Sequence, residues 1–313
     1  MNLSLDELKK SMEREGYISE EELAVTVFLA LTLKKPLLVE GAPGVGKTEI
    51  AKVLGKVFHT EVIRLQCYEG LDENKALYEW NYQRQLLKIQ LLKDACDRRE
   101  IEKDLFDEEY LLERPLLKAI RSDRQVVLLI DEVDKVDEPF EAFLFELLSD
   151  FQVSIPELGT LAARQIPIVV LTSNGDRELS DGLKRRCVYL YIDYPDIEKE
   201  VRILQMKVPE AGERLNREVA TAVNYIRSNL ELRKQPSIAE SLDWARALVA
   251  LHADALTVEN MTRTANLLLK NRDDCMQLLD GQVMDGILQC ISGAGAGDKS
   301  LSGCHCHSHR HSN

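Results

Sequence analysis

Short apolar runs recur along the first two thirds of the chain, and the segments between them return apolar residues every three or four positions. Runs of this length are typical of buried strands, and the intervening segments are typical of helices. The runs occupy residues 36–40, 61–67, 125–130, 167–173 and 187–192. Because strands that alternate with helices pair in parallel, the pattern predicts an α/β fold with a parallel five-stranded sheet flanked by helices.

The same periodicity places the helices of this part of the chain. The predicted helices are residues 4–14, 19–33, 47–58, 141–150 and 179–186. Ser4 and Ser19 stand at the N-cap positions of the first two, where a serine hydroxyl accepts a backbone N–H bond.

Two segments depart from the simple alternation. Residues 70–122 are charged and mostly helical in pattern, and they are longer than one crossover helix requires. We expect an insertion that decorates the sheet, either a solvated helical hairpin or an element that faces a partner. Residues 151–155 and 163–166, on either side of a turn with Pro156 and Gly159, predict a β-hairpin.

The pattern becomes entirely helical after Pro195. The predicted helices there are residues 196–206, 213–229, 238–252 and 257–279. Residues 237–240 spell Ser-Ile-Ala-Glu, a capping box for the third of them.

These patterns predict four segments. Residues 1–34 are N-terminal helices, and residues 35–195 are an α/β core that includes the insertion at about 70–122. Residues 196–292 form a small all-helical domain, and residues 293–313 combine a flexible glycine-rich linker with a Cys/His tail.

Composition limits the class of protein. The 313 residues are 45% hydrophobic and 30% charged, which is typical of a soluble globular protein with a real core. The net charge of −13 argues against a nucleic-acid surface. The longest apolar run, residues 23–33, is too short to span a bilayer, and the N-terminus lacks a signal pattern, so we expect a cytoplasmic protein.

A phosphate-binding motif joins the first apolar run to the helix after it. Residues 41–48 read Gly-Ala-Pro-Gly-Val-Gly-Lys-Thr and fit G-x-x-x-x-G-K-[ST]. Backbone N–H groups at the helix N-terminus should face an anion, Lys47 should reach the β- and γ-phosphates, and the Thr48 hydroxyl should bind Mg²⁺. The residues expected to surround the nucleotide are Gly41, Ala42, Pro43, Gly44, Val45, Gly46, Lys47, Thr48 and Glu49, with ATP and Mg²⁺ as cofactors.

Polar residues end two other predicted strands. Asp131 and Glu132 follow the run at 125–130, and Asn174 follows the run at 167–173. Ligand sites in open α/β sheets lie beyond the carboxyl ends of the strands. Asp131 is therefore placed to hold Mg²⁺, and Glu132 to take a proton from the attacking water. Asn174 would orient that water, or it simply forms a turn before Gly175.

The tail offers soft and imidazole ligands in alternation. Cys304, His305, Cys306 and His307 open this stretch and would suit Zn²⁺, Cu⁺ or Ni²⁺. A disordered polar terminus is the simpler interpretation, and both stay open.

With the phosphate loop, the paired acids, the asparagine and a helical lid in this order, the chain resembles an AAA+ ATPase of the P-loop NTPase class. More narrowly, it is similar to the MoxR family and its CoxD-like branch. The stretches that carry this likeness are residues 64–72, 76–82, 172–174, 177–181 and 183–187.

The resemblance implies further roles. Asn174 matches the first sensor, and Arg186 matches an arginine finger that acts on ATP in the neighbouring subunit, with Arg185 as the alternative. A homo-oligomeric ring, usually a hexamer, is therefore implied. The second sensor of the family is commonly arginine where this chain has Ala239, so Arg233, Lys234 or Arg246 would have to substitute.

These observations support Mg²⁺-dependent ATP hydrolysis by a ring that remodels or activates a client protein. The resemblance suggests maturation of a metalloenzyme of the molybdenum hydroxylase or CO dehydrogenase type, with a von Willebrand A-domain protein as adaptor. A nucleic-acid-dependent motor and a nucleotide-gated scaffold with little turnover are the alternatives.

Overall fold

The computed structural model describes residues 3–92, 108–156 and 158–294. These residues form two compact units. One unit contains the chain up to Pro195 together with Ser237–Ala239, and the other contains Asp196–Pro236 together with the chain from Glu240.

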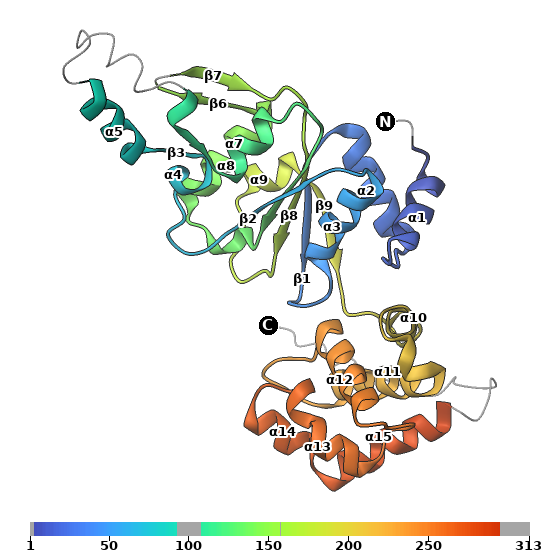
Figure 1. The fold of residues 1–313 in the computed structure, drawn as a ribbon. Coiled ribbons are helices and arrows are strands. Elements are labelled where there is room, and N and C mark those ends of the chain that lie inside the picture. Colours follow the sequence, from blue (N-terminus) through green and yellow to red (C-terminus); the bar gives the residue numbers. More distant parts are fainter. Residues whose placement is uncertain (1–2, 93–107, 157, 295–313) are drawn as a thin grey trace, which may run out of the picture. The chain divides into compact units, whose positions relative to one another are not determined.

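A five-stranded sheet forms the centre of the first unit, as predicted (Figure 1). Its strands are β1 (Leu37–Gly41), β2 (Val62–Gln66), β5 (Val127–Asp131), β8 (Ile168–Ser173) and β9 (Val188–Ile192). They lie in the order β2-β5-β8-β1-β9, and every neighbouring pair is parallel. This order places the carboxyl ends of β1, β5 and β8 side by side.

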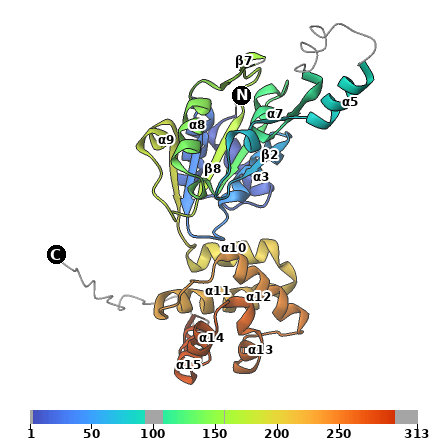
Figure 2. The same cartoon turned by 90° about the vertical axis from the view of Figure 1, so that its left-hand side faces the viewer.

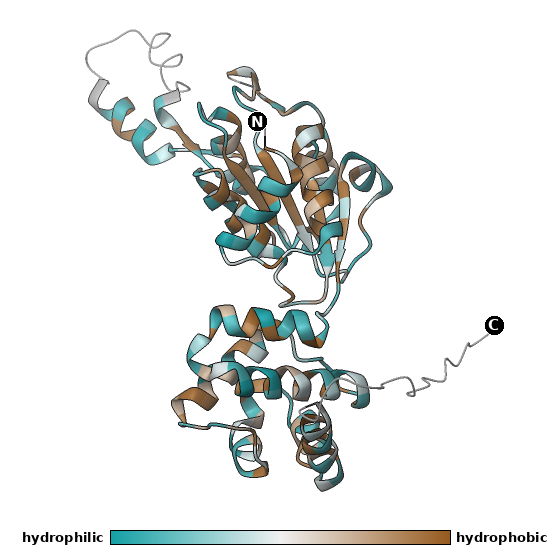
Figure 3. Cartoon of the chain, turned by 90° about the vertical axis from the view of Figure 1, so that its right-hand side faces the viewer, coloured by the Kyte–Doolittle hydropathy of each residue, from teal (hydrophilic) through white to brown (hydrophobic). Residues whose placement is uncertain are grey.

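Helices cover both faces of this sheet (Figure 2). On one face lie α1 (Leu5–Arg14), α2 (Glu21–Leu33) and α3 (Lys47–Val57), and on the other lie α7 (Pro115–Arg121), α8 (Glu138–Asp150) and α9 (Asp181–Arg186). Successive strand residues enter opposite cores, so Leu128 packs with α7 and α8 whereas Leu129 packs with α3. The strands are therefore apolar along most of their length (Figure 3).

One of the two predicted serine caps is wrong. Ser4 forms a capping box with Glu7 at the start of α1, as expected. Helix α2 begins later than predicted, so Glu20 is its N-cap, no side chain caps it, and Ser19 is buried. The acidic residues in the first turn of α2 interact favourably with the positive end of the helix dipole, and this stabilises the helix start without a side-chain cap.

The insertion contains strands besides the predicted helices, because β3 (Tyr78–Trp80) and β4 (Leu111–Glu113) pair as a small antiparallel sheet. Its last part is not a decoration, because α7 buries Leu116, Leu117 and Ile120 in the core against β2 and β5. Its remaining described elements are α4 (Glu73–Ala76), α5 (Tyr82–Leu92) and the 3₁₀ turn η1 (Glu108–Tyr110).

The predicted hairpin is present, but its second strand is earlier than expected. Strand β6 (Gln152–Ile155) pairs antiparallel with β7 (Gly159–Ala162), and Ile155 lies opposite Gly159. Gly159 has a φ of 80°, so it closes the turn as the strand begins, and residues 163–166 lie beyond β7.

The second unit contains only helices among its described residues. They are α10 (Ile197–Lys207), η3 (Pro209–Ala211), α11 (Gly212–Asn229), α12 (Ile238–Ala250), α13 (Val258–Leu268), α14 (Arg272–Leu278) and α15 (Gly281–Ala294). The single helix predicted at 257–279 is two helices, because Asn271 is extended and caps α14 through the N–H of Asp273. Gly293 and Ala294 close α15 where a linker was expected, and the Cys/His tail lies outside the described residues.

The second unit has a core of its own around Trp244, whose Nε1 donates to Thr264 Oγ1 at 2.7 Å. A buried ion pair joins Arg227 to Glu200 at 2.6 Å. In neither unit do the described residues contain a helix that is both long enough and apolar enough to cross a membrane.

Candidate nucleotide-binding site

The phosphate loop connects β1 to α3, and its glycines adopt backbone conformations that residues with a Cβ rarely adopt. Gly44 and Gly46 have φ values of 79° and 98°, and Gly46 is the N-cap of α3. A Cβ on Gly41 would lie 2.2 Å from the carbonyl oxygen of Ile192, so β9 packs directly against the start of the loop. The loop therefore exposes the first N–H groups of α3 at a fixed position.

Lys47 extends along the inside of this loop. Its Nζ donates to the carbonyl oxygens of Gly41 at 2.6 Å and Ala42 at 2.8 Å, and to Asn174 Oδ1 at 2.8 Å. The residue is only 6% exposed. Burial lowers the pKa of Lys47, and nearby carboxylates, Asp134 first among them, oppose the shift.

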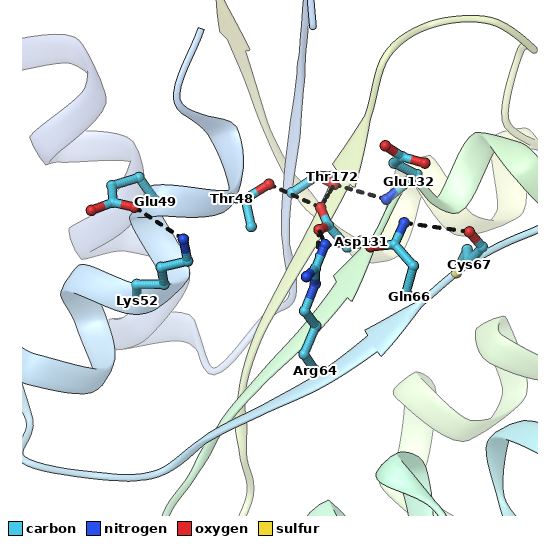
Figure 4. A network of polar contacts seen from close by, with 9 residues as sticks. All are labelled: Thr48, Glu49, Lys52, Arg64, Gln66, Cys67, Asp131, Glu132 and Thr172. Atoms are coloured by element: carbon cyan, nitrogen blue, oxygen red, sulfur yellow. Dashed lines mark hydrogen bonds and ion pairs between the residues drawn. The ribbon is translucent and has the colours of Figure 1, made fainter. Parts of the chain in front are cut away.

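Asp131 is the centre of a polar network at the end of β5 (Figure 4). Its Oδ1 accepts hydrogen bonds from Thr48 Oγ1 at 3.0 Å and Thr172 Oγ1 at 2.6 Å. Its Oδ2 accepts from Arg64 Nε at 3.0 Å and Nη2 at 2.5 Å. The carboxylate thus links the first turn of α3 to strands β2 and β8.

Glu132 adopts an unusual backbone conformation directly after Asp131. Its φ and ψ of 57° and 51° lie in the left-handed region, and the short 3₁₀ turn η2 (Val133–Lys135) follows. Its N–H donates to Thr172 Oγ1 at 2.9 Å. Thr172 therefore fixes both the Asp131 carboxylate and the backbone that carries Glu132.

Asp134 holds the turn that presents Asn174. Its Oδ2 accepts backbone N–H bonds from Asn174 at 3.1 Å and Asp176 at 3.0 Å. Its Oδ1 is buried and has no hydrogen-bond partner among the described residues. Asn174 does precede a turn, since Gly175 has a φ of 77°, but its side chain faces Lys47.

The structure therefore brings together Lys47, Thr48, Asp131 and Asn174. Glu132 directly follows Asp131 in the sequence. The donor set fits Mg²⁺, since a hydroxyl and a carboxylate oxygen meet at 3.0 Å. In the described ranges, no group of three or more His, Cys, Asp or Glu side chains is arranged to hold a metal. A cation here would take its other ligands from phosphate and water, as Mg²⁺ sites commonly do.

Arg186 lies apart from this group. It is exposed on α9, where its guanidinium carbon is 5.2 Å from the centre of the Phe145 ring. The following strand starts with Val188 beside Leu37 and ends with Ile192 beside Gly41. Val188 therefore lies about 13 Å along the sheet from Ile192, and Arg186 precedes Val188, at the opposite end of β9 from the phosphate loop. Arg185 is also exposed on α9.

A buried carboxylate attaches α9 to α8. Glu141 on α8 is 2% exposed and pairs with Arg177 at 2.7 Å. It also accepts the N–H of Ser180, the N-cap of α9, at 2.6 Å. Glu141 thereby fixes the start of the helix that carries Arg186.

The second-sensor position stays a prediction. Ala239 lies in the first turn of α12. Within the helical unit, Arg233 pairs with Asp273 at 2.9 Å and Arg246 with Asp243 at 3.2 Å.

Three residues of the network were not predicted as site residues: Arg64, Thr172 and Asp134. Thr172 had a signal, because it is a hydroxyl at the end of an otherwise apolar strand, next to the predicted Asn174. Asp134 follows the paired acids by two positions. The partner of Arg64 depends on β2 lying next to β5, which the sequence does not specify.

Comparison with known proteins agrees with this geometry. Residues 36–187 match the family model described as AAA domain (dynein-related subfamily). This stretch is therefore similar to AAA domains. The five-stranded parallel sheet, the phosphate loop and the helical C-terminal region together give the chain the fold of an AAA+ P-loop NTPase, as predicted.

Sequence similarity to other proteins extends beyond residues 36–187. An uncharacterized protein of Staphylococcus haemolyticus is 26% identical over 265 residues, which cover 80% of this chain and 90% of the relative. An uncharacterized protein of Staphylococcus aureus strain bovine RF122 / ET3-1 is 26% identical over 242 residues, which cover 74% of this chain and 81% of the relative.

Solved structures with a similar arrangement include RuvB of Thermotoga maritima. The RuvB Holliday junction branch migration motor has 16% identity and a TM-score of 0.46, with 87% of this chain and 73% of RuvB covered. A point mutant of the same RuvB has 14% identity and a TM-score of 0.48, with 96% of this chain and 85% of the mutant covered. The fold assignment rests instead on the sheet and on the match to the family model.

Proposed function

We propose that the protein is a Mg²⁺-dependent ATPase that works as an oligomeric ring and uses hydrolysis to remodel a client protein. AAA+ P-loop NTPases bind nucleotide, usually with Mg²⁺, and are typically ring-shaped oligomers. The observation that carries the proposal is the pair of contacts from Lys47 to Asn174 and from Thr48 to Asp131. They connect the phosphate loop to the two strand ends that bear candidate catalytic side chains.

The residues of the loop would bind and orient the triphosphate. The N–H groups at the start of α3 face the anion, and Lys47 supplies positive charge beside them. All three protons of the Lys47 ammonium are engaged by the protein, so phosphate oxygens would replace at least one of these acceptors. Asn174 is the acceptor that would become free to hold the attacking water.

Glu132 would act as the general base. The left-handed backbone at this residue separates the direction of its side chain from that of Asp131, so one carboxylate can serve the cation and the other the water. Thr48 and Asp131 would hold Mg²⁺, which when bound neutralises charge on the phosphate oxygens.

Arg186 would act on the site of the adjacent subunit. Because it precedes β9, at the end of that strand opposite its own loop, a second copy of the chain would supply the site on which it acts. An arginine finger of this kind is worth about 10³ to 10⁵ in rate in other nucleotidases. A hexameric ring is the assembly that we propose, with Arg185 as the alternative finger.

The client proposal depends on the resemblance to the MoxR family and its CoxD-like branch, which the uncharacterized relatives do not test. We propose a cytoplasmic ATPase that activates a metalloenzyme, with a molybdenum hydroxylase such as CO dehydrogenase as the first enzyme to test. A von Willebrand A-domain protein is the proposed adaptor.

The proposal is tested with Glu132→Gln. This variant should bind ATP with Mg²⁺ as tightly as the wild type and hydrolyse it at least about 10²-fold more slowly, because the amide cannot take a proton. Full turnover in the variant would remove Glu132 as the base, and failure of the wild type to bind ATP would refute the proposal as a whole.

The same variant identifies the client and separates the alternatives. Because it should stay in the ATP-bound state, affinity capture followed by mass spectrometry should retain a client that Lys47→Ala does not. ATPase rates with and without DNA or RNA test the motor alternative, and single-turnover hydrolysis tests the scaffold alternative.

A further inference from the structure

The partners of the Asp131 carboxylate are divided between its two oxygens. Within the part of the chain that the structure describes, Oδ1 accepts only from the hydroxyls of Thr48 and Thr172. Oδ2 accepts twice from Arg64, and no other described residue donates to it (Figure 4). One oxygen is thus bonded to neutral groups and the other to a cation.

Arg64 is not needed to orient this carboxylate. Thr172 on β8 already fixes it at 2.6 Å, and Thr48 on α3 adds a second bond. Arg64 reaches Asp131 from β2, on the opposite side of β5 from β8. Its side chain is 54% exposed whereas that of Asp131 is 5% exposed, so the guanidinium covers the carboxylate from the side of the solvent.

A guanidinium in this position neutralises part of the carboxylate charge that would attract a divalent cation. Mg²⁺ would meet Asp131 at Oδ1, beside Thr48, whereas Arg64 binds Oδ2 of the same carboxylate. The cation and the guanidinium would therefore repel each other across a few ångströms. Movement of Arg64 away from Asp131 consequently favours filling of the metal site.

We propose that Arg64 competes with the divalent cation for Asp131 and thereby sets the Mg²⁺ concentration at which the site fills. This inference rests on the proposed function, since it assumes that Asp131 is a magnesium ligand. Arg64 has an alternative partner in place, because its Nη2 also donates to Gln66 Oε1 at the end of β2. A displaced guanidinium can therefore remain beside the site without contacting Asp131.

The surrounding charges support a role for Arg64 in competing with the cation more than a role in stabilising the fold. The site combines four acids with three cations, and these groups are Asp131, Glu132, Asp134, Asp176, Lys47, Arg64 and Lys135. Lys47 is occupied by the phosphate loop and Lys135 by Asp176 at 3.1 Å. Removing Arg64 alone therefore leaves a more negative site that attracts a divalent cation more strongly.

The test compares Arg64→Gln and Arg64→Lys with the wild type. The binding of the non-hydrolysable ATP analogue AMP-PNP is measured by calorimetry across a series of free Mg²⁺ concentrations. Arg64→Gln should reach half-maximal binding at about three- to tenfold lower Mg²⁺, because a partly exposed ion pair no longer has to be broken. The Mg²⁺ concentration at half-maximal binding for Arg64→Lys should lie between those of Arg64→Gln and the wild type. Lysine keeps the charge but cannot donate from two nitrogens of a guanidinium.

Arg114→Gln is the matched control. Arg114 is also a partly exposed arginine in an ion pair, with Glu79 at 2.5 Å in the β3–β4 sheet, and its loss changes the net charge equally. Its Mg²⁺ dependence should equal that of the wild type.

A second readout excludes a merely structural effect. In EDTA and without nucleotide, Arg64→Gln should melt at a lower temperature than the wild type, because the buried Asp131 loses its counter-charge. With AMP-PNP and saturating Mg²⁺ the difference should narrow. A difference that persists unchanged, or half-maximal binding at equal or higher Mg²⁺, would overturn the inference while leaving the proposed ATPase intact. Absence of binding by the wild type would overturn both.

Discussion

Two residues of the site have unfavourable local environments that the rest of the fold must compensate. Glu132 has a left-handed backbone conformation, which costs about 1–2 kcal/mol for a residue with a Cβ. Asp134 buries a carboxylate oxygen that lacks a partner among the described residues. Such strain is concentrated at functional sites in proteins, and here both residues adjoin the contacts between the loop and the strand ends.

Thr172 provides a residue-scale test, because its hydroxyl serves both Asp131 and the N–H of Glu132. Thr172→Val keeps the shape and removes both bonds. We expect a loss of about 1–3 kcal/mol in the free energy of unfolding, measured by urea titration, because a buried N–H and a carboxylate oxygen lose a partner. The turnover number for ATP should fall by about tenfold with a smaller change in KM, because Glu132 would be less well positioned.

Thr172→Ser is the control for this substitution, since it restores the hydroxyl. It should recover most of the turnover and stability. Equal turnover of the valine variant and the wild type would show that Thr172 does not position Glu132.

At the scale of elements, the helices and strands that could be predicted are those marked by a continuous or periodic apolar pattern in the sequence. The central strands β1, β5 and β8 were predicted because they are buried on both faces and are apolar almost throughout. The edge strands β2 and β9 are each exposed on one face, but their apolar residues still recur closely enough to be read as strands. The strands β3 and β4 were missed because three residues cannot establish an alternation. The break near Asn271 was missed because the apolar periodicity continues through it.

The site was predictable to the same extent. Lys47, Thr48, Asp131 and Asn174 follow from a motif and from strand ends, and they meet in the structure. Arg64 requires knowledge of the strand order, which depends on packing between distant segments. Likewise, α7 shows its apolar stripe in the sequence, but its place against β2 and β5 does not follow from that stripe.

The link between α8 and α9 gives a test based on pH. Burial acts to raise the pKa of Glu141, but hydrogen bonds from Ser180 and Arg177 outweigh it and leave the pKa below its ordinary value. A lowered carboxyl pKa stabilises the folded state above the pKa of the unfolded chain, about 4.3, and this contribution is lost as the pH falls through the folded pKa. Glu141→Gln should therefore be less stable than the wild type by about 1–2 kcal/mol at pH 7.

This difference should decrease as the pH falls below the unfolded-chain value of about 4.3 and through the lowered pKa of Glu141 in the folded protein. Urea unfolding at pH 7, 5 and 3.5 measures it. Glu178→Gln is the matched control, because Glu178 is 87% exposed and pairs with Lys184 at 3.2 Å, so its effect should be small at every pH. A penalty for Glu141→Gln that does not depend on pH would contradict the assignment.

At the scale of the whole molecule, the position of Arg186 gives a test of the proposed active site shared between two chains. Each chain supplies a phosphate loop at one end of the sheet and an exposed arginine nearer the other. A head-to-tail contact between identical chains would join these two ends, and such contacts form a ring when the rotation from one subunit to the next closes.

Mixing two inactive variants tests this arrangement. Arg186→Ala keeps an intact loop but supplies no finger, whereas Lys47→Ala supplies a finger but binds the phosphates poorly. Each alone should lose at least about 10²-fold in ATP turnover. In an equal mixture, about a quarter of the contacts should pair an intact loop with an intact arginine, so phosphate release should return to about that share of the wild-type rate.

Light scattering on the same samples should show that both variants assemble, so that loss of activity is not loss of the ring. A second mixture, of Arg185→Ala with Lys47→Ala, tests the neighbouring arginine. If Arg186 is the finger, Arg185→Ala should be active alone and should gain nothing from the mixture. If Arg186 served its own chain instead, the Arg186→Ala subunits could not be rescued by any neighbour. Assembled mixtures without recovery would then exclude a shared active site, and activity would be a property of the single chain.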